Sequence, residues 1–72
     1  MNSELILQPT GFEGEIKELK GDEFLQSRLV DLGIVRGEKI KISQKSLFGD
    51  LIVEVRGTHV ALRAHEARCL LV

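Results

Sequence analysis

The chain has 72 residues, of which 43% are hydrophobic and 29% charged, and its formal net charge at pH 7 is -1. This length predicts one domain, residues 1–72, that buries only about 60% of the surface of the unfolded chain. The nearly balanced charge gives no electrostatic basis for a nucleic-acid partner. The apolar runs fall well short of the roughly 18 residues that a bilayer span requires, and the first residues lack the positive charge of a signal peptide. We therefore expect a cytoplasmic protein that does not insert into a membrane by itself.

The first predicted strand covers residues 13–19. An apolar segment at residues 5–7 precedes this strand, and Pro9 marks a turn between the two. The alternation within the strand is imperfect, and Ile16 and Leu19 are its expected anchors in the core.

A short helix is predicted over residues 22–32. Asp22 is a suitable N-cap, because its carboxylate can accept a hydrogen bond from an unpaired amide of the first turn. Gly33 is placed to end the helix in the left-handed conformation. One apolar stripe faces the core, formed by Leu25, Leu29 and Leu32.

Residues 38–43 alternate strictly between polar and apolar and predict a half-buried strand with Ile40 and Ile42 pointing inward. Residues 44–50 then predict a loop, since Gly49 and Asp50 are turn formers.

A β-hairpin is predicted from residues 51–56 and 59–63, joined by a two-residue type II′ turn at Gly57 and Thr58. Pairing Arg56 with His59 gathers the apolar side chains on one face. On that face, Val55 lies opposite Val60 and Val53 lies opposite Leu62.

The C-terminal end predicts a single helical turn at residues 64–68 and a closing strand at residues 69–72. Several short strands with one short helix fit a mainly β fold, a small and partly open β-barrel. Closing the sheet into a barrel also protects its edge strands from pairing with other chains.

With these elements in place, the order and spacing of several motifs resemble the FeoA family of bacterial ferrous iron uptake. The family pattern is Arg-Leu-x-x-Leu-Gly-hydrophobic-x-x-Gly, then Gly-Asp-Pro, Arg-Gly and Leu-Arg-x-x-Glu-Ala. The resemblance runs from about residue 5 to the end. The positions that carry it are Arg28, Leu29, Leu32, Gly33, Gly37, Gly49, Asp50, Arg56, Gly57, Leu62, Arg63, Glu66 and Ala67.

The chain departs from the family pattern at two positions, which bear on the rigidity of the loops and on the details of partner binding. Leu51 follows Gly-Asp where the family usually has proline, and Arg36 stands where a proline often precedes the second glycine of the turn. Neither departure touches a catalytic group.

The resemblance implies an SH3-like barrel without enzymatic activity that binds and modulates a FeoB-type permease through its cytoplasmic GTPase region. It would place the protein at the inner face of the membrane through that partner. A related domain is found at the C-terminus of metal-dependent repressors. The alternative is therefore that the chain is a regulatory module that responds to a transition metal. Weak self-association is a further partner hypothesis.

Neither a metal site nor a catalytic site is predicted. The candidate metal ligands lack the close spacing of known metal motifs; they are His59, His65, Cys69 and Glu66. We therefore expect no cofactor, with a bound transition metal ion as the weaker alternative. No serine has a nucleophile-elbow context, and no glycine-rich loop leads to a Lys-Ser/Thr pair. Only three phenylalanines could stack on bases, which further disfavours nucleic acid.

The candidate partner-binding residues are Leu47, Phe48, Arg28 and Arg56. Leu47 and Phe48 stand at the tip of a polar loop, where exposed apolar side chains mark a protein contact, unless Phe48 folds back to plug the barrel end. Arg28 either meets a partner or bonds neighbouring groups of its own fold. The residues expected to shape turns and caps are Asp22, Gly33, Gly37, Gly49 and Gly57.

Overall fold

The structure is a computed structural model that describes residues 2–72. Its elements are η1 (Leu5–Leu7), β1 (Glu13–Glu15), β2 (Glu18–Leu19), α1 (Glu23–Asp31), β3 (Lys39–Lys45), β4 (Leu51–Val55), β5 (Thr58–Leu62), α2 (Ala64–Ala67) and β6 (Leu70–Leu71).

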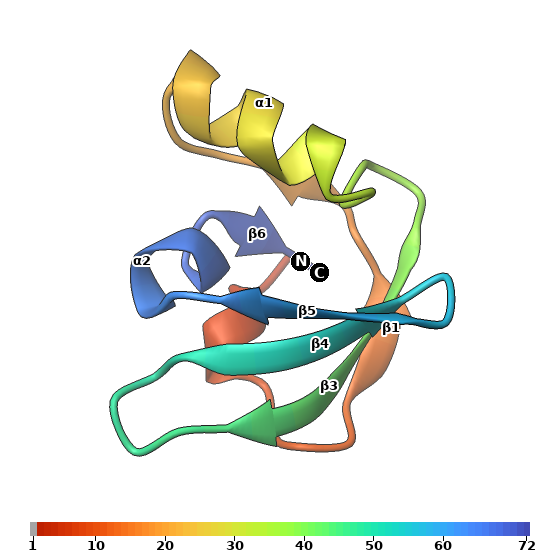
Figure 1. Ribbon diagram of the computed structural model, residues 1–72, viewed down its shortest axis with the longest axis vertical. Helices are drawn as coiled ribbons and strands as arrows, with labels where there is room; N and C mark the ends of the chain where they lie inside the picture. The colour runs from red at the N-terminus through yellow and green to blue at the C-terminus, as the bar shows by residue number, and fades with distance from the viewer. Residues whose placement is uncertain (1) are drawn as a thin grey trace.

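The strands form two antiparallel sheets that enclose one core (Figure 1). The larger sheet runs β1-β3-β4-β5, and the smaller one pairs β2 with β6. Beside β6, Ser3 and Val72 exchange backbone hydrogen bonds of 2.9 and 2.8 Å. The predicted mainly β architecture is therefore confirmed. Its fully buried apolar side chains are those of Leu5, Ile16, Leu29, Ile34, Ile40, Ile42, Leu51, Val53, Val55, Leu62, Ala67 and Leu70.

The predicted continuous strand over residues 13–19 is wrong, because the chain changes sheets in its middle. Up to Ile16 the backbone bonds the larger sheet, since the Ile16 N–H donates to the Glu38 carbonyl at 2.9 Å. One residue later the Lys17 N–H donates to the Leu71 carbonyl at 2.7 Å. Ile16 is nevertheless a fully buried anchor. Hydrophobic alternation indicates which side a residue faces but not which strand it pairs with, so it could not show this break.

The helix α1 is slightly shorter than its predicted range and buries less of its stripe. Leu29 is fully buried and Leu25 partly buried, whereas Leu32 is 37% exposed. The helix ends in a Schellman motif, in which the Ile34 N–H donates to the Leu29 carbonyl and the Gly33 N–H to the Val30 carbonyl, both at 2.9 Å. A single helix packed over one side of a small barrel needs only a narrow apolar face.

The strand β3 extends two residues beyond its predicted end and contains an irregularity between Ile42 and Gln44. Ile40 and Ile42 are both buried, as their alternation predicts. The extension shortens the following loop, because Lys45 still pairs with Leu51 of β4. Residues 46–50 alone therefore form the connection.

The hairpin forms, but its predicted turn and register are wrong. Val55 pairs with Thr58, so the two-residue loop is Arg56-Gly57. Both loop residues have positive φ, 54° and 78°, as a type I′ turn requires. The same faces still point inward because the register differs by two residues, which preserves the side of each side chain. Val53 consequently faces Val60 instead of Leu62.

Candidate functional site

The loop at residues 46–50 presents its two apolar side chains directly to solvent. Leu47 is 100% exposed and Phe48 87% exposed, so the alternative in which Phe48 plugs the barrel end is wrong. Ser46 and Asp50 close the loop with a backbone hydrogen bond of 2.8 Å. The exposed pair therefore stands at the tip of a tight β3–β4 connection.

Internal hydrogen bonds hold this loop in one shape. The Ser46 hydroxyl accepts from the N–H groups of Phe48 and Asp50 at 3.2 and 3.0 Å. Gly49 has φ +92°, and a Cβ there would lie 3.2 Å from the Ala64 Cβ and 3.3 Å from the Ile6 Cδ1. A side chain at this position would therefore be both strained and crowded. The apolar tip is preorganised before any partner arrives.

Two further contacts anchor the loop to its neighbours. The Asp50 Oδ1 accepts the Ala64 N–H at 3.0 Å, which joins the loop to the start of α2. The Lys45 Nζ, at the base of the loop, donates to the carbonyls of Ile6 and Gln8 at 3.0 and 2.8 Å. These bonds secure η1, whose Leu7 is 73% exposed. Sequence reasoning missed Leu7, because an apolar triplet at residues 5–7 gives no indication of which member faces outward.

Arg28 forms an ion pair with a buried carboxylate. Its Nε donates to the Glu66 Oε2 at 2.7 Å, across 38 positions of sequence. The Glu66 side chain is only 4% exposed, and its Oε1 accepts the Arg63 N–H at 2.8 Å. The Arg28 side chain remains 55% exposed. Arg28 thus joins α1 to α2 and still presents part of its guanidinium to solvent.

A hollow of about 320 Å³ lies on the outer side of α1 beside Arg28. Phe24 is 83% exposed there, although sequence analysis gave it no role in a site. The residues lining the hollow are Phe24, Ser27, Arg28, Asp31 and Leu32.

Arg56 lies away from the other candidate contacts. It sits in the turn at the far end of β4 from Leu47 and Phe48. Its Nε donates to the Glu38 Oε2 at 3.1 Å, and its side chain is 70% exposed. The structure therefore places Leu47 and Phe48 near α2, connects α2 to Arg28, and separates Arg56 from this group.

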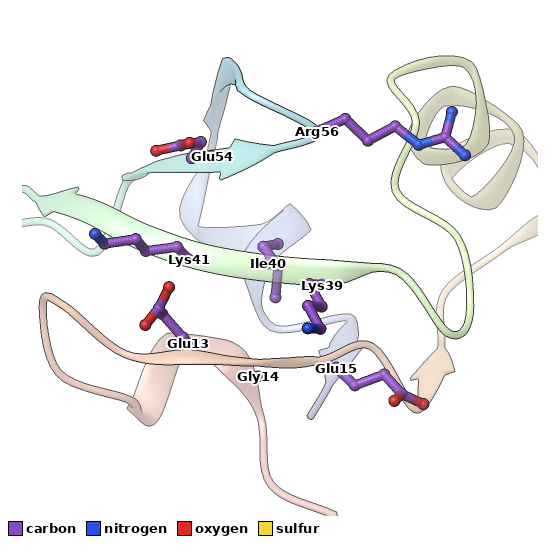
Figure 2. A pocket seen from close by; sticks show the side chains of 8 residues that line it. All are labelled: Glu13, Gly14, Glu15, Lys39, Ile40, Lys41, Glu54 and Arg56. Atoms are coloured by element: carbon purple, nitrogen blue, oxygen red, sulfur yellow. The ribbon is translucent and has the colours of Figure 1, made fainter.

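Arg56 borders a shallow groove of about 400 Å³ on the larger sheet (Figure 2). Figure 2 shows the Arg56 side chain directed away from the other lining side chains. Acidic and basic residues alternate across the strands, and Glu13, for example, is the register partner of Lys41. Because these charges balance, the groove has no strong preference for an anion or a cation. Its lining residues are Glu13, Gly14, Glu15, Lys39, Ile40, Lys41, Glu54 and Arg56.

The predicted turn and cap residues occupy the conformations that their types favour. The Asp22 Oδ1 accepts the Leu25 N–H at 2.8 Å at the start of α1. The four predicted turn glycines all have positive φ and are Gly33, Gly37, Gly49 and Gly57.

The weak metal candidates are spread over the structure. His59 lies 3.9 Å from Glu54 through its Nε2 and that residue's Oε1, while His65 is exposed. The Cys69 thiol donates to the His65 carbonyl at 3.4 Å, and Glu66 is engaged by Arg28. Between residues 2 and 72, no three His, Cys, Asp or Glu side chains are grouped to hold a metal ion. In the same range, no helix has the length and hydropathy to cross a bilayer.

Comparison with known families shows to which family the chain belongs. The model of the FeoA domain matches residues 5–72. The chain belongs to the FeoA domain family. The family is one of ferrous iron transport. No curated protein matches the chain.

Solved structures share the fold of the chain. An iron uptake regulatory protein, FeoA, is 24% identical with a TM-score of 0.92, covering 100% of this chain and 96% of its own. FeoA of Stenotrophomonas maltophilia, a zinc complex described as a prokaryotic SH3 domain protein, is 29% identical with a TM-score of 0.66. That match covers 97% of this chain and 86% of the other. The fold is therefore an SH3-like barrel.

A manganese-dependent transcriptional repressor contains the same fold. It is 16% identical with a TM-score of 0.92, and the match covers 99% of this chain but only 40% of the repressor. The likeness at this identity concerns the fold alone. The resemblance to a domain of metal-dependent repressors is thus structural.

Proposed function

We propose that this chain binds the cytoplasmic GTPase region of a FeoB-type permease and modulates ferrous iron uptake, with Leu47 and Phe48 as the central contact. The observation that carries the proposal is the exposed and internally braced apolar tip. Exposed apolar side chains lower solubility and contribute nothing to the core, whereas a rigid aromatic anchor binds a partner at low entropic cost.

The surroundings of the tip support a larger contact surface. Asp50 bonds α2 at Ala64, and Glu66 of α2 bonds Arg28. The loop tip, α2 and α1 follow one another along one side of the molecule (Figure 1). Arg28 can therefore serve as a polar contact at the border of the same surface, while Arg56 lies outside it.

Membership of the family supports the choice of partner. The Stenotrophomonas maltophilia relative is described as a candidate activating factor of ferrous iron transport. Direct contact with the transport machinery is the simplest way for such a factor to act. A permease whose cytoplasmic region hydrolyses GTP offers a protein surface and a conformational cycle that such a contact could modulate.

Binding of the purified chain to the intact permease in detergent micelles tests the proposal. We expect binding in the presence of guanine nucleotide and a loss of affinity of at least about tenfold for Phe48→Ala, as for a central anchor. Arg56→Ala is the matched control, because it removes an exposed side chain outside the surface. Absence of wild-type binding in every nucleotide state would reject the partner. Wild-type affinity in Phe48→Ala would reject the surface.

A further inference from the structure

The strand β5 ends the larger sheet with one open edge. The sheet order is β1-β3-β4-β5, and the pairing of β5 with β4 starts at Val55 and Thr58 across a two-residue turn. In such a hairpin the closing pair is hydrogen-bonded, and bonded and non-bonded pairs then alternate. Thr58, Val60 and Leu62 therefore bond β4. His59 and Ala61 direct their N–H and C=O groups away from it.

These outward groups have no backbone partner within residues 2–72. His59 and Ala61 are both exposed, as is Thr58 at the start of the strand. An uncovered row of alternating donors and acceptors is a template for another strand.

The opposite edge of the same sheet is protected against such pairing. The Ile42 N–H donates to the Phe12 carbonyl, and Gly14 is the register partner of Ile40, so Glu13 and Glu15 face outward from β1. Both glutamates are exposed, and charged side chains along an edge disfavour pairing with another strand. The edge of β5 carries neither a carboxylate nor a lysine, a proline or a bulge.

We propose that the edge of β5 pairs with β5 of a second copy of this chain, antiparallel and about a two-fold axis at Val60. In this register His59 lies opposite Ala61 of the partner subunit, so each outward N–H meets an outward C=O. Val60 lies beside Val60 of the partner subunit at the axis. No like charges stand opposite each other, and the two larger sheets become continuous.

The short length of β5 determines the strength of this contact. Pairing a strand of five residues buries much less area than the roughly 1,200 Å² of a stable interface. The dimer is therefore transient and forms only at high protein concentration. Its surface differs from the tip formed by Leu47 and Phe48, so the dimer and the proposed permease complex are separate interactions.

Amide NMR spectra and hydrogen exchange of the full chain, from about 20 μM to about 1 mM, test the proposal over the range expected for a weak interface. We expect concentration-dependent shifts at residues 58–62, together with slower exchange of the His59 and Ala61 amides at high concentration. Sedimentation equilibrium gives the stoichiometry. A chain that stays monomeric throughout, or shifts confined to residues 46–50, would overturn the proposal. This measurement on the unmodified chain needs no variant to fold.

The variant Ala61→Pro separates edge pairing from other association. It removes an outward N–H without removing a ladder bond to β4, and proline is tolerated on such an edge. We expect the dissociation constant to rise at least about tenfold, equivalent to about 1.4 kcal/mol. Ala61→Ser, which keeps the N–H, and Glu15→Pro, on the protected edge of β1, should associate as the wild type does. Equal association of folded Ala61→Pro would contradict the pairing.

Discussion

Glu66 shows how one buried charge connects parts of the fold that are distant in sequence. Its two oxygens accept from Arg28 on α1 and from the Arg63 backbone at the start of α2. A buried carboxylate is costly unless its lone pairs are satisfied, and these bonds meet that need. The Arg-Leu and Glu-Ala motifs at residues 28–29 and 66–67 are thus two halves of one structural contact.

Replacing Arg28 with alanine should destabilise the protein by about 1–2 kcal/mol, because it leaves Glu66 buried without its cationic partner. The expected loss is below that of a fully buried pair, since the Arg28 side chain is 55% exposed and partly screened. Urea unfolding measures the difference.

Arg56→Ala provides the control for this comparison. Its ion pair with Glu38 is largely exposed on the arginine side, so its loss should change the free energy of unfolding by about 0.5 kcal/mol or less. Equal destabilisation by the two variants would contradict a special role for the Arg28–Glu66 contact.

Among the elements, the β4–β5 hairpin illustrates how backbone conformation decides a register. Arg56 adopts φ 54°, which is uncommon for a residue with a Cβ, and Gly57 follows at φ 78°. Type I′ turns favour Asn-Gly at these two positions and match the twist of the strands. The hairpin is therefore built with a suboptimal first turn residue.

Arg56→Asn should stabilise the protein by about 0.5 kcal/mol, because asparagine tolerates the left-handed conformation and the lost ion pair is exposed. Thermal unfolding followed by circular dichroism measures the change. Since Arg56→Ala loses the same ion pair without relieving the strain, it should not share the gain. If Arg56→Asn instead destabilises the protein, the ion pair between Arg56 and Glu38 contributes more to stability than the strain at Arg56 costs.

At the scale of the whole molecule, the apolar residues divide into one core and a few exposed side chains. Ile16 lies at the corner where the chain passes from the larger to the smaller sheet and is fully buried. Phe48 and Phe24 are exposed by more than four fifths and contribute little to folding. A domain of this length has a total stability of only about 4–10 kcal/mol, so the core tolerates few losses.

Ile16→Ala should cost about 3–4 kcal/mol through lost burial and the cavity it leaves. Phe48→Ala should change the free energy of unfolding by less than about 0.5 kcal/mol, because its ring is already in water. Chemical unfolding at low temperature measures both variants. A strongly destabilised Phe48→Ala protein would show that the tip has a structural role, and would remove the main argument for a docking role.

The sequence by itself determined much of the local structure, because local features depend on neighbouring residues. The cap at Asp22, the helix end at Gly33 and the inward faces of Ile40 and Ile42 follow from capping chemistry and periodicity. The order of motifs along the chain also predicted the family and the barrel, and both are confirmed.

Only the tertiary structure decided the features that depend on residues far apart in sequence. It broke the first strand at Ile16, because each half pairs with a different strand, and it moved the hairpin turn to Arg56-Gly57. It gave Arg28 a partner 38 positions away and kept Phe48 outside the barrel. Pairing and burial of this kind arise from the packing of the whole chain, whereas periodicity and turn chemistry describe only its neighbourhoods.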